Sequence, residues 1–286
     1  MKQKRRVALL AGIAAVVLLL GGGAALLAVR GDWRYRVLYT LTPAKTGILQ
    51  PVEADWESRE WTDAELENDG RVTVRNTLML VNPEHPLGKE YEPALVAFGD
   101  WQMTDETREA FERLRARVEA ETGERLLIRS AYRSWEEQQA ELETGRETIA
   151  ARPGESEHEA GRARDICVKG YGGQAFLKTA AGRLVNRSCA EEGFVVRYPM
   201  GKERVTGFGF EPWHLRYVGR VHASAMQAGK LTLEEYIGGM TPEQWYEYDG
   251  CLILRSGKAT VALPQSFAEC SISTDGCGYR IFTVVR

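Results

Sequence analysis

Two segments decide the predicted fold of this chain. The first is Ser156-Glu157-His158-Glu159-Ala160-Gly161-Arg162-Ala163-Arg164-Asp165, and the second, further along the chain, is Glu211-Pro212-Trp213-His214-Leu215-Arg216-Tyr217. The first segment offers an imidazole and a carboxylate seven positions apart, and the second offers an imidazole three positions after a carboxylate. Two histidines and one aspartate, His158, His214 and Asp165, form a ligand set that catalytic zinc ions use, with the fourth coordination position open for water. The glutamate that opens the second segment can then take a proton from that water.

Composition places few limits on the chain but sharpens the metal prediction. The chain has 286 residues and a net charge of -3, so nucleic acid is not indicated as a partner. It has only four histidines, so few other ligand sets are possible. His85 lies between prolines in a predicted loop and His222 in a predicted helix, and we interpret both as structural.

The cysteines do not predict a structural zinc site. The five cysteines are Cys167, Cys189, Cys251, Cys270 and Cys277. No C-x-x-C pair occurs, and the odd number leaves at least one thiol outside any intramolecular disulfide. Cys167 shares a strand face with Asp165, where we favour a small buried residue over a zinc ligand. The pairing of the last three cysteines stays open.

The N-terminus predicts a membrane anchor. Basic residues at positions 2, 4, 5 and 6 precede an uncharged apolar run of 23 residues from Val7 to Val29, which is long enough to span a bilayer. Because basic residues remain in the cytoplasm, the rest of the chain is predicted to be exported. The protein would then be a single-pass cell-membrane protein whose folded part faces the cell wall. The alternative is a cleaved signal peptide, whose apolar core is normally only about 7–15 residues long.

Composition and periodicity divide the chain into four segments. Residues 1–30 are the basic stub and the anchor, and residues 31–70 resemble a polar stalk. Residues 71–239 alternate between helices and strands, and residues 240–286 read as a small β-rich appendage of unknown role. Helices are predicted over residues 104–121, 135–144, 174–192, 218–228 and 232–237. Strands are predicted over residues 126–128, 163–168, 194–198, 205–210, 213–217, 252–254, 260–263 and 279–285.

Three motifs in this order carry a resemblance to a known family. They are Tyr132-Arg133-Ser134-x-x-x-Gln138, Ser156-x-His158-x-x-Gly161-x-Ala163-x-Asp165 and Glu211-x-Trp213-His214-x-Arg216-Tyr217. Together they resemble the VanY-like zinc D-alanyl-D-alanine carboxypeptidases over residues 76–238. The resemblance implies an α+β fold in which a small antiparallel sheet carries a zinc site and is flanked by helices. Residues 71–239 would then be the zinc peptidase domain.

The resemblance also implies roles for individual residues. The implied roles are zinc ligands for His158, Asp165 and His214, general acid/base for Glu211, substrate-carboxylate anchor for Arg133, and helpers in substrate binding for Gln138 and Ser156. The chain departs from the family pattern at Glu159, where relatives often carry an amide, and at Cys167.

The implied function is zinc-dependent removal of the C-terminal D-alanine from peptidoglycan stem peptides. An L,D-carboxypeptidase acting on tetrapeptide stems and a D,D-dipeptidase remain alternatives with the same chemistry. A non-catalytic cell-wall-binding module is a further alternative, because a peptidase fold can lose its chemistry and keep its pocket. The oligomeric state is not predicted.

Overall fold

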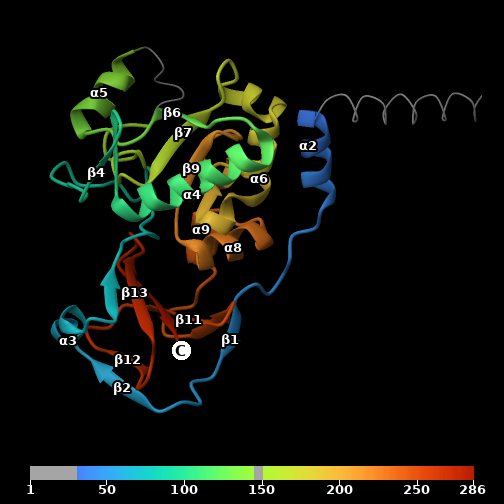
Figure 1. Cartoon of the computed structure of the whole chain (residues 1–286). Coiled ribbons are helices and arrows are strands. Elements are labelled where there is room, and N and C mark those ends of the chain that lie inside the picture. Colours follow the sequence, from blue (N-terminus) through green and yellow to red (C-terminus); the bar gives the residue numbers. More distant parts are fainter. Residues whose placement is uncertain (1–30, 145–150) are drawn as a thin grey trace, which may run out of the picture.

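The structure is a computed structural model that describes residues 31–144 and 151–286. Figure 1 shows a helix-rich part that surrounds a small sheet and, beside it, a second part built mainly of strands. The helices are α2 (Gly31–Leu41), α3 (Asp63–Asn68), α4 (Asp105–Thr122), α5 (Trp135–Glu143), α6 (Ala180–Ser188), α7 (Glu203–Thr206), α8 (Arg220–Gly229) and α9 (Leu233–Gly238), with 3₁₀ turns η1 (Gly173–Lys178) and η2 (Cys189–Glu192). The strands are β1 (Gln50–Val52), β2 (Ser58–Trp61), β3 (Val72–Val74), β4 (Val96–Phe98), β5 (Trp101–Met103), β6 (Leu127–Ser130), β7 (Ala163–Cys167), β8 (Phe194–Val196), β9 (His214–Tyr217), β10 (Trp245–Tyr248), β11 (Cys251–Ser256), β12 (Val261–Pro264), β13 (Glu269–Thr274) and β14 (Arg280–Val285).

The sheet β6-β7-β9-β8 joins the two histidine-bearing segments. All three of its strand pairings are antiparallel. In the register between β7 and β9, Asp165 lies directly opposite His214. Cross-strand partners in an antiparallel pair have Cβ atoms about 4.5–5.5 Å apart, so this register alone brings the two side chains together. The predicted α+β fold with a small antiparallel sheet among helices is confirmed.

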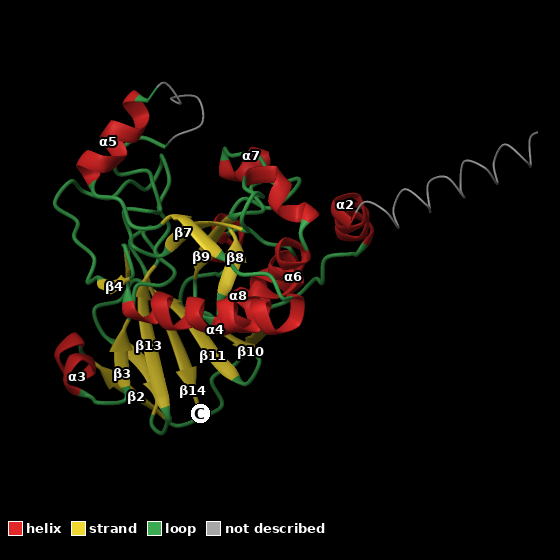
Figure 2. Ribbon diagram, turned by 45° about the horizontal axis from the view of Figure 1, so that its top comes forward, coloured by secondary structure: helices red, strands yellow, loops and turns green. Residues whose placement is uncertain are grey.

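Helix α4 packs its apolar face on this sheet, beside α6 (Figure 2). Phe111, Leu114 and Val118 are at most 1% exposed and contact the core residues of β7 and β9. Their i, i+3, i+7 spacing puts them on one helix face. Gly123 ends the helix with φ of 69°, a left-handed conformation that glycine adopts without a Cβ clash. The helix predicted over residues 104–121 is therefore confirmed.

Two of the predicted elements are wrong. The single helix expected over residues 174–192 is instead η1, α6 and η2, because the Thr179 hydroxyl accepts a hydrogen bond from Gly182 N (2.9 Å) and starts a new helix there. The strand expected over residues 205–210 is absent. Part of it is α7, which ends at Gly207 in a left-handed conformation with φ of 77°.

Residues 31–70 differ from the expected stalk. Strand β1 pairs with β10, and β2 pairs with β12, so this segment supplies strands to the C-terminal sheets. Trp61 (4% exposed) and Leu66 (2%) are buried in the same hydrophobic cluster as Leu252 and Phe282. The segment is ordered because its apolar side chains complete a core whose other half lies near the C-terminus.

The C-terminal residues form the predicted β-rich appendage. The order of its main sheet is β1-β10-β11-β14-β13-β3, with β3 joining in parallel to β13. Strands β10 and β13 were not predicted. All five cysteines are free thiols. The anchor predicted over residues 1–30 lies outside the described residues, and no helix within 31–144 or 151–286 has the length and apolar character needed to cross a bilayer.

A buried arginine in β7 leads to a stability prediction. Arg164 is 0% exposed, and its guanidinium lies 4.6 Å from the ring centroid of Phe111 and 5.1 Å from that of Phe194. None of its three side-chain nitrogens has a hydrogen-bond partner among the described residues. Burial lowers the pKa of Arg164 from 12.5 to about 9. Since the folded-state pKa is the lower one, the buried charge destabilises the fold fully below about pH 9, and the cost fades as the pH rises towards 12.5.

We therefore expect Arg164→Met to stabilise the protein at pH 7, on the order of 1–4 kcal/mol in the free energy of unfolding, because an apolar side chain of similar length removes the desolvated charge. Denaturant titration of the wild type and the variant measures this difference. Arg125→Met, at an exposed position, is the control and should change the free energy of unfolding by less than about 0.5 kcal/mol. If the Arg164→Met protein were less stable than the wild type, contacts in the folded protein would have to offset the cost of burying the guanidinium charge.

Candidate metal centre

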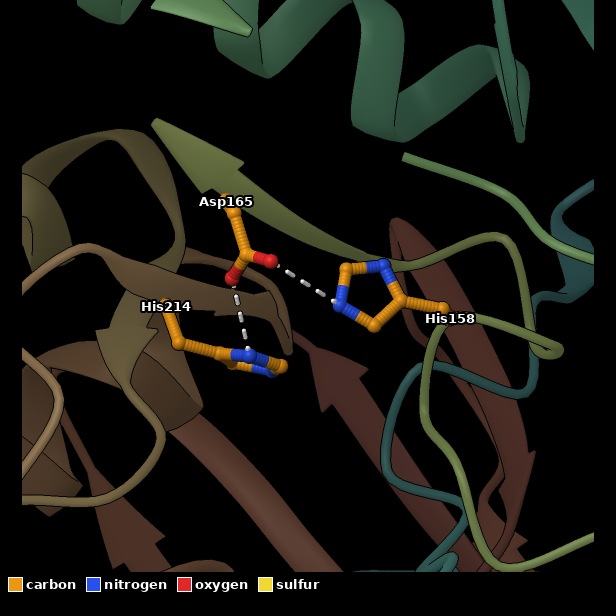
Figure 3. Close-up of side chains that lie close together, drawn as sticks. All are labelled: His158, Asp165 and His214. Carbon is orange, nitrogen blue, oxygen red and sulfur yellow. Dashed lines mark ion pairs between the residues drawn. The ribbon is translucent and has the colours of Figure 1, made fainter. Parts of the chain in front are cut away.

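Three side chains from two strands and one loop converge on a single point (Figure 3). His158 Nε2 lies 3.6 Å from Asp165 Oδ2, and His214 Nδ1 lies 3.2 Å from Asp165 Oδ1. The three candidate ligand atoms are all within 4.8 Å of one another. Tetrahedral zinc with bonds of about 2.1 Å separates its ligand atoms by about 3.4 Å. The trio therefore fits one zinc ion with little rearrangement.

The imidazole of His158 is held in one orientation by the backbone. Its Nδ1 lies 2.6 Å from the carbonyl oxygen of Ala131, to which the Nδ1–H donates. A neutral imidazole carries one proton, so this bond leaves the lone pair on Nε2, the nitrogen that faces Asp165. A hydrogen bond that fixes the tautomer in this way is usual for metal-binding histidines.

His214 rests against a buried carboxylate to which the sequence analysis assigned no role. His214 Nε2 lies 3.9 Å from Glu157 Oε2. The side chain of Glu157 is 0% exposed and pairs through Oε1 with Arg197 (2.7 Å) and Arg216 (3.0 Å). Glu157 thus lies beside the far nitrogen of His214, at a distance longer than a hydrogen bond, while Nδ1 faces the trio. A sequence signal for this buried cluster exists, because charged residues stand inside otherwise apolar segments. Charged side chains are buried almost only when they are paired, so such residues can be expected to pair with one another.

The protonation states of Asp165 and His158 suit a cation. Burial disfavours the carboxylate of Asp165, but the neighbouring His158 and His214 lower the pKa of Asp165 to about 2. Burial lowers the pKa of His158 to about 3, so this imidazole is neutral at pH 7. Burial also acts against a charged His214, but Asp165 and the nearby glutamates raise its pKa overall. Asp165 Oδ1 is buried without a hydrogen-bond partner among the described residues, as expected for a carboxylate oxygen that faces an ion.

The trio lines a cavity of about 500 Å³ that contains most of the predicted site. Arg133, Ser156 and Glu211 line the same cavity. Glu211 Oε2 lies 3.7 Å from His214 Nδ1, and burial raises the pKa of Glu211. A carboxylate with a raised pKa beside the metal position suits a group that accepts and then returns a proton. Arg129 also lines the cavity, although sequence reasoning did not single it out.

Gln138 is the one predicted site residue that the structure places outside the cavity wall. It is 1% exposed, and its Nε2 donates a hydrogen bond to the carbonyl oxygen of Ala151 (2.7 Å). Ala151 lines the cavity, so Gln138 acts on the site by positioning that loop. Glu159 also supports a loop, because its carboxylate accepts hydrogen bonds from Gly154 N at 2.8 and 3.0 Å.

The other candidate ligands lie elsewhere. His222 is hydrogen-bonded to the hydroxyls of Tyr236 (2.8 Å) and Thr283 (2.9 Å). The ring of His85 is bonded to Asn82 Oδ1 (3.0 Å). Cys167 is not part of the trio.

Comparison with known proteins gives consistent matches. The family model for VanY, D-alanyl-D-alanine carboxypeptidase, matches residues 100–220. The putative carboxypeptidase YodJ of Bacillus subtilis is 34% identical over 218 residues, which are 68% of this chain and 79% of that protein. VanXYC of Enterococcus gallinarum, a bifunctional D-Ala-D-Ala dipeptidase and D-Ala-D-Ala carboxypeptidase, is 36% identical over 179 residues, which are 56% of this chain and 93% of that protein.

Two solved structures are similar in fold and sequence. The LdcB LD-carboxypeptidase superposes with a TM-score of 0.54 and 30% identity, covering 66% of this chain and 97% of that one. A VanY D,D-pentapeptidase variant in complex with Zn(II) superposes with a TM-score of 0.50 and 30% identity, covering 57% of this chain and 99% of that one.

Proposed function

The chain belongs to the VanY family of zinc D-alanyl-D-alanine carboxypeptidases, and from this premise we propose that it removes the C-terminal D-alanine from peptidoglycan stem peptides. It is a peptide hydrolase whose cofactor is zinc. The observation that carries the proposal is the presence in one cavity of a zinc-compatible trio, a glutamate and an arginine. These are the parts needed to cut a peptide bond next to a free carboxylate.

Each part has a separate role. His158, Asp165 and His214 hold the metal. Zinc, when bound, lowers the pKa of water towards about 7 and polarises the scissile carbonyl. Glu211 accepts the proton of the attacking water at its carboxylate and then delivers it to the leaving amine. Arg133 binds the terminal carboxylate of the substrate through its planar pair of N–H donors, which orients the last peptide bond.

The choice of D,D-carboxypeptidase over its alternatives can be tested by product analysis. LdcB is an LD-carboxypeptidase, and VanXYC is also a dipeptidase, so both other activities occur among the relatives. The zinc-loaded protein should be incubated separately with pentapeptide stem, tetrapeptide stem and D-alanyl-D-alanine. We expect release of one D-alanine from the pentapeptide. Cleavage of the tetrapeptide alone would assign L,D specificity, and cleavage of the dipeptide alone would assign a dipeptidase.

Arg133 can be tested as the carboxylate anchor. We expect Arg133→Ala to lower kcat/KM for a pentapeptide with a free C-terminus by about 10- to 100-fold, because a charge-assisted hydrogen bond contributes about 1.5–3 kcal/mol. The value of kcat/KM for the same peptide with an amidated C-terminus should fall much less, since that peptide offers no carboxylate. Arg125→Ala is the control at an exposed position. Equal losses on the free and amidated peptides would contradict this role.

The N-terminal sequence supports a location for this activity. We propose that residues 7–29 hold the protein in the cell membrane with the peptidase domain, residues 71–239, on the cell-wall side. An enzyme held there would meet stem peptides close to the bilayer. Protease treatment of intact cells would degrade an exported domain and spare a cytoplasmic one. Recovery of a shorter, freely released form would support cleavage of a signal peptide.

A further inference from the structure

A cavity of about 690 Å³ lies between α2 and the α6–α8 side of the peptidase part, apart from the metal centre. Helix α2 forms one wall, and η1, α6 and the end of α8 form the other. The basic residues that line it are Arg34, Lys178, Arg183, Arg187 and Lys230. None of the described residues that line it is acidic. A chain with a net charge of -3 therefore gathers five positive side chains around one hollow.

Two of these cations build the cavity and three are available to a ligand. Lys230 Nζ donates to the carbonyl oxygens of Thr42 (2.5 Å) and Tyr39, and Arg183 donates to that of Lys178 (2.7 Å). Arg34, Lys178 and Arg187 are exposed, and their side chains make no hydrogen bond or ion pair within the described residues. Three unpaired cations with no acidic neighbour in the lining make a site for an anionic group.

The outward face of α2 is apolar beside this cavity. Trp33 (46% exposed), Leu38 (51%) and Leu41 (73%) are three of the large hydrophobic side chains that remain exposed, and all lie on this helix. At 100° per residue they fall within an arc of about 140°, which also contains Arg34. Tyr35 lies outside this arc and is buried, and it lines the cavity together with Arg34 and Leu38. Tryptophan and leucine next to arginine are typical of a helix that lies in the interfacial layer of a bilayer.

The position of α2 in the sequence indicates which surface it meets. The described part of the helix starts at Gly31, two positions after Val29, where the apolar run of the sequence ends. A chain that leaves a bilayer at residue 29 would have α2 at the level of the lipid headgroups. The cations, the exposed apolar side chains and this position all favour an anionic lipid headgroup as the ligand.

We propose that the cavity between α2 and α6 binds the phosphate of an anionic phospholipid headgroup and thereby docks the peptidase domain on the bilayer surface. Arg34, Lys178 and Arg187 contact the phosphate, while Trp33, Leu38 and Leu41 enter the interfacial layer. The site is separate from the metal centre, so its occupancy does not alter cleavage of a soluble peptide.

The test uses the full chain in zwitterionic detergent micelles. Dihexanoyl-phosphatidylglycerol, dihexanoyl-phosphatidylcholine and inorganic phosphate are titrated separately, and binding is followed by microscale thermophoresis. We expect the phosphatidylglycerol to bind with a Kd at least about tenfold lower than that of the other two probes. The triple variant Arg34→Gln, Lys178→Gln, Arg187→Gln should weaken this binding on the order of 100-fold, since each basic residue near an anionic lipid surface contributes about 1 kcal/mol.

A matched triple variant controls for net charge. Arg125→Gln, Lys169→Gln and Arg204→Gln remove three exposed charges elsewhere and should leave the Kd unchanged. Hydrolysis of a soluble pentapeptide checks that both triple variants are folded. If the triple variant of the cavity does not fold, the single variant Arg34→Gln is used in its place. Equal affinity for phosphatidylcholine, or unchanged binding by the cavity variant, overturns the proposal. Equally tight binding of inorganic phosphate also overturns it, in favour of a free anion.

Discussion

Glu211→Gln is expected to reduce kcat on the pentapeptide stem by about 10²–10⁴-fold while zinc remains bound, because the amide cannot accept and return the proton. The amide keeps the size of the carboxylate, and Glu211 is not one of the three candidate metal ligands. Glu211 Oε2 lies 3.7 Å from His214 Nδ1, which is beside the proposed metal position.

The measurement combines steady-state kinetics with zinc content by atomic absorption on the same preparation. Glu119→Gln, at an exposed position on α4, is the matched control and should keep both zinc and activity. A Glu211→Gln enzyme with near wild-type kcat would remove Glu211 from the mechanism. Loss of zinc together with activity would instead assign it to metal binding.

Removing one member of the trio should have the second large effect. We expect His158→Ala and Asp165→Asn to weaken zinc binding by more than about 100-fold, which exceeds the usual effect of changing a residue that only orients a ligand. Activity should fall to the level of the metal-free protein. Zinc affinity is measured by competition with a chromophoric chelator.

His85→Ala is the histidine control, since the ring of His85 is bonded to Asn82 in a loop outside the trio. This variant should bind zinc as the wild type does. Full zinc occupancy in both trio variants would show that the ion binds elsewhere. Excess zinc that restores Asp165→Asn activity would still support the trio, because a weakened site fills at a higher metal concentration.

The candidate site was predictable because its chemistry depends on a few residue types at fixed spacings. The register between β7 and β9 brings Asp165 opposite His214, and the strand periodicity of both segments was visible in the sequence. Glu157 was missed because its role depends on Arg197 and Arg216, which lie 40 and 59 positions away in the chain.

The fold was predictable where the signal is local. Helix α4 has an apolar face and a terminal glycine within one segment, and it was found. Residues 31–70 resemble a stalk in the sequence because the strands they pair with are distant along the chain. Gln50 pairs with Glu247 and Trp61 with Val261, and such pairings leave no trace in local periodicity. The strand prediction over residues 205–210 is wrong because valine and phenylalanine favour strands, whereas Gly207 ends a short helix there.

We propose that one zinc ion is held by His158, Asp165 and His214. Anomalous diffraction at the zinc absorption edge from crystals of the zinc-loaded protein tests it most directly. One dominant peak is expected about 2.0–2.2 Å from His158 Nε2, His214 Nδ1 and a carboxylate oxygen of Asp165. A dominant peak bound by other residues, or none among these three side chains, would contradict it.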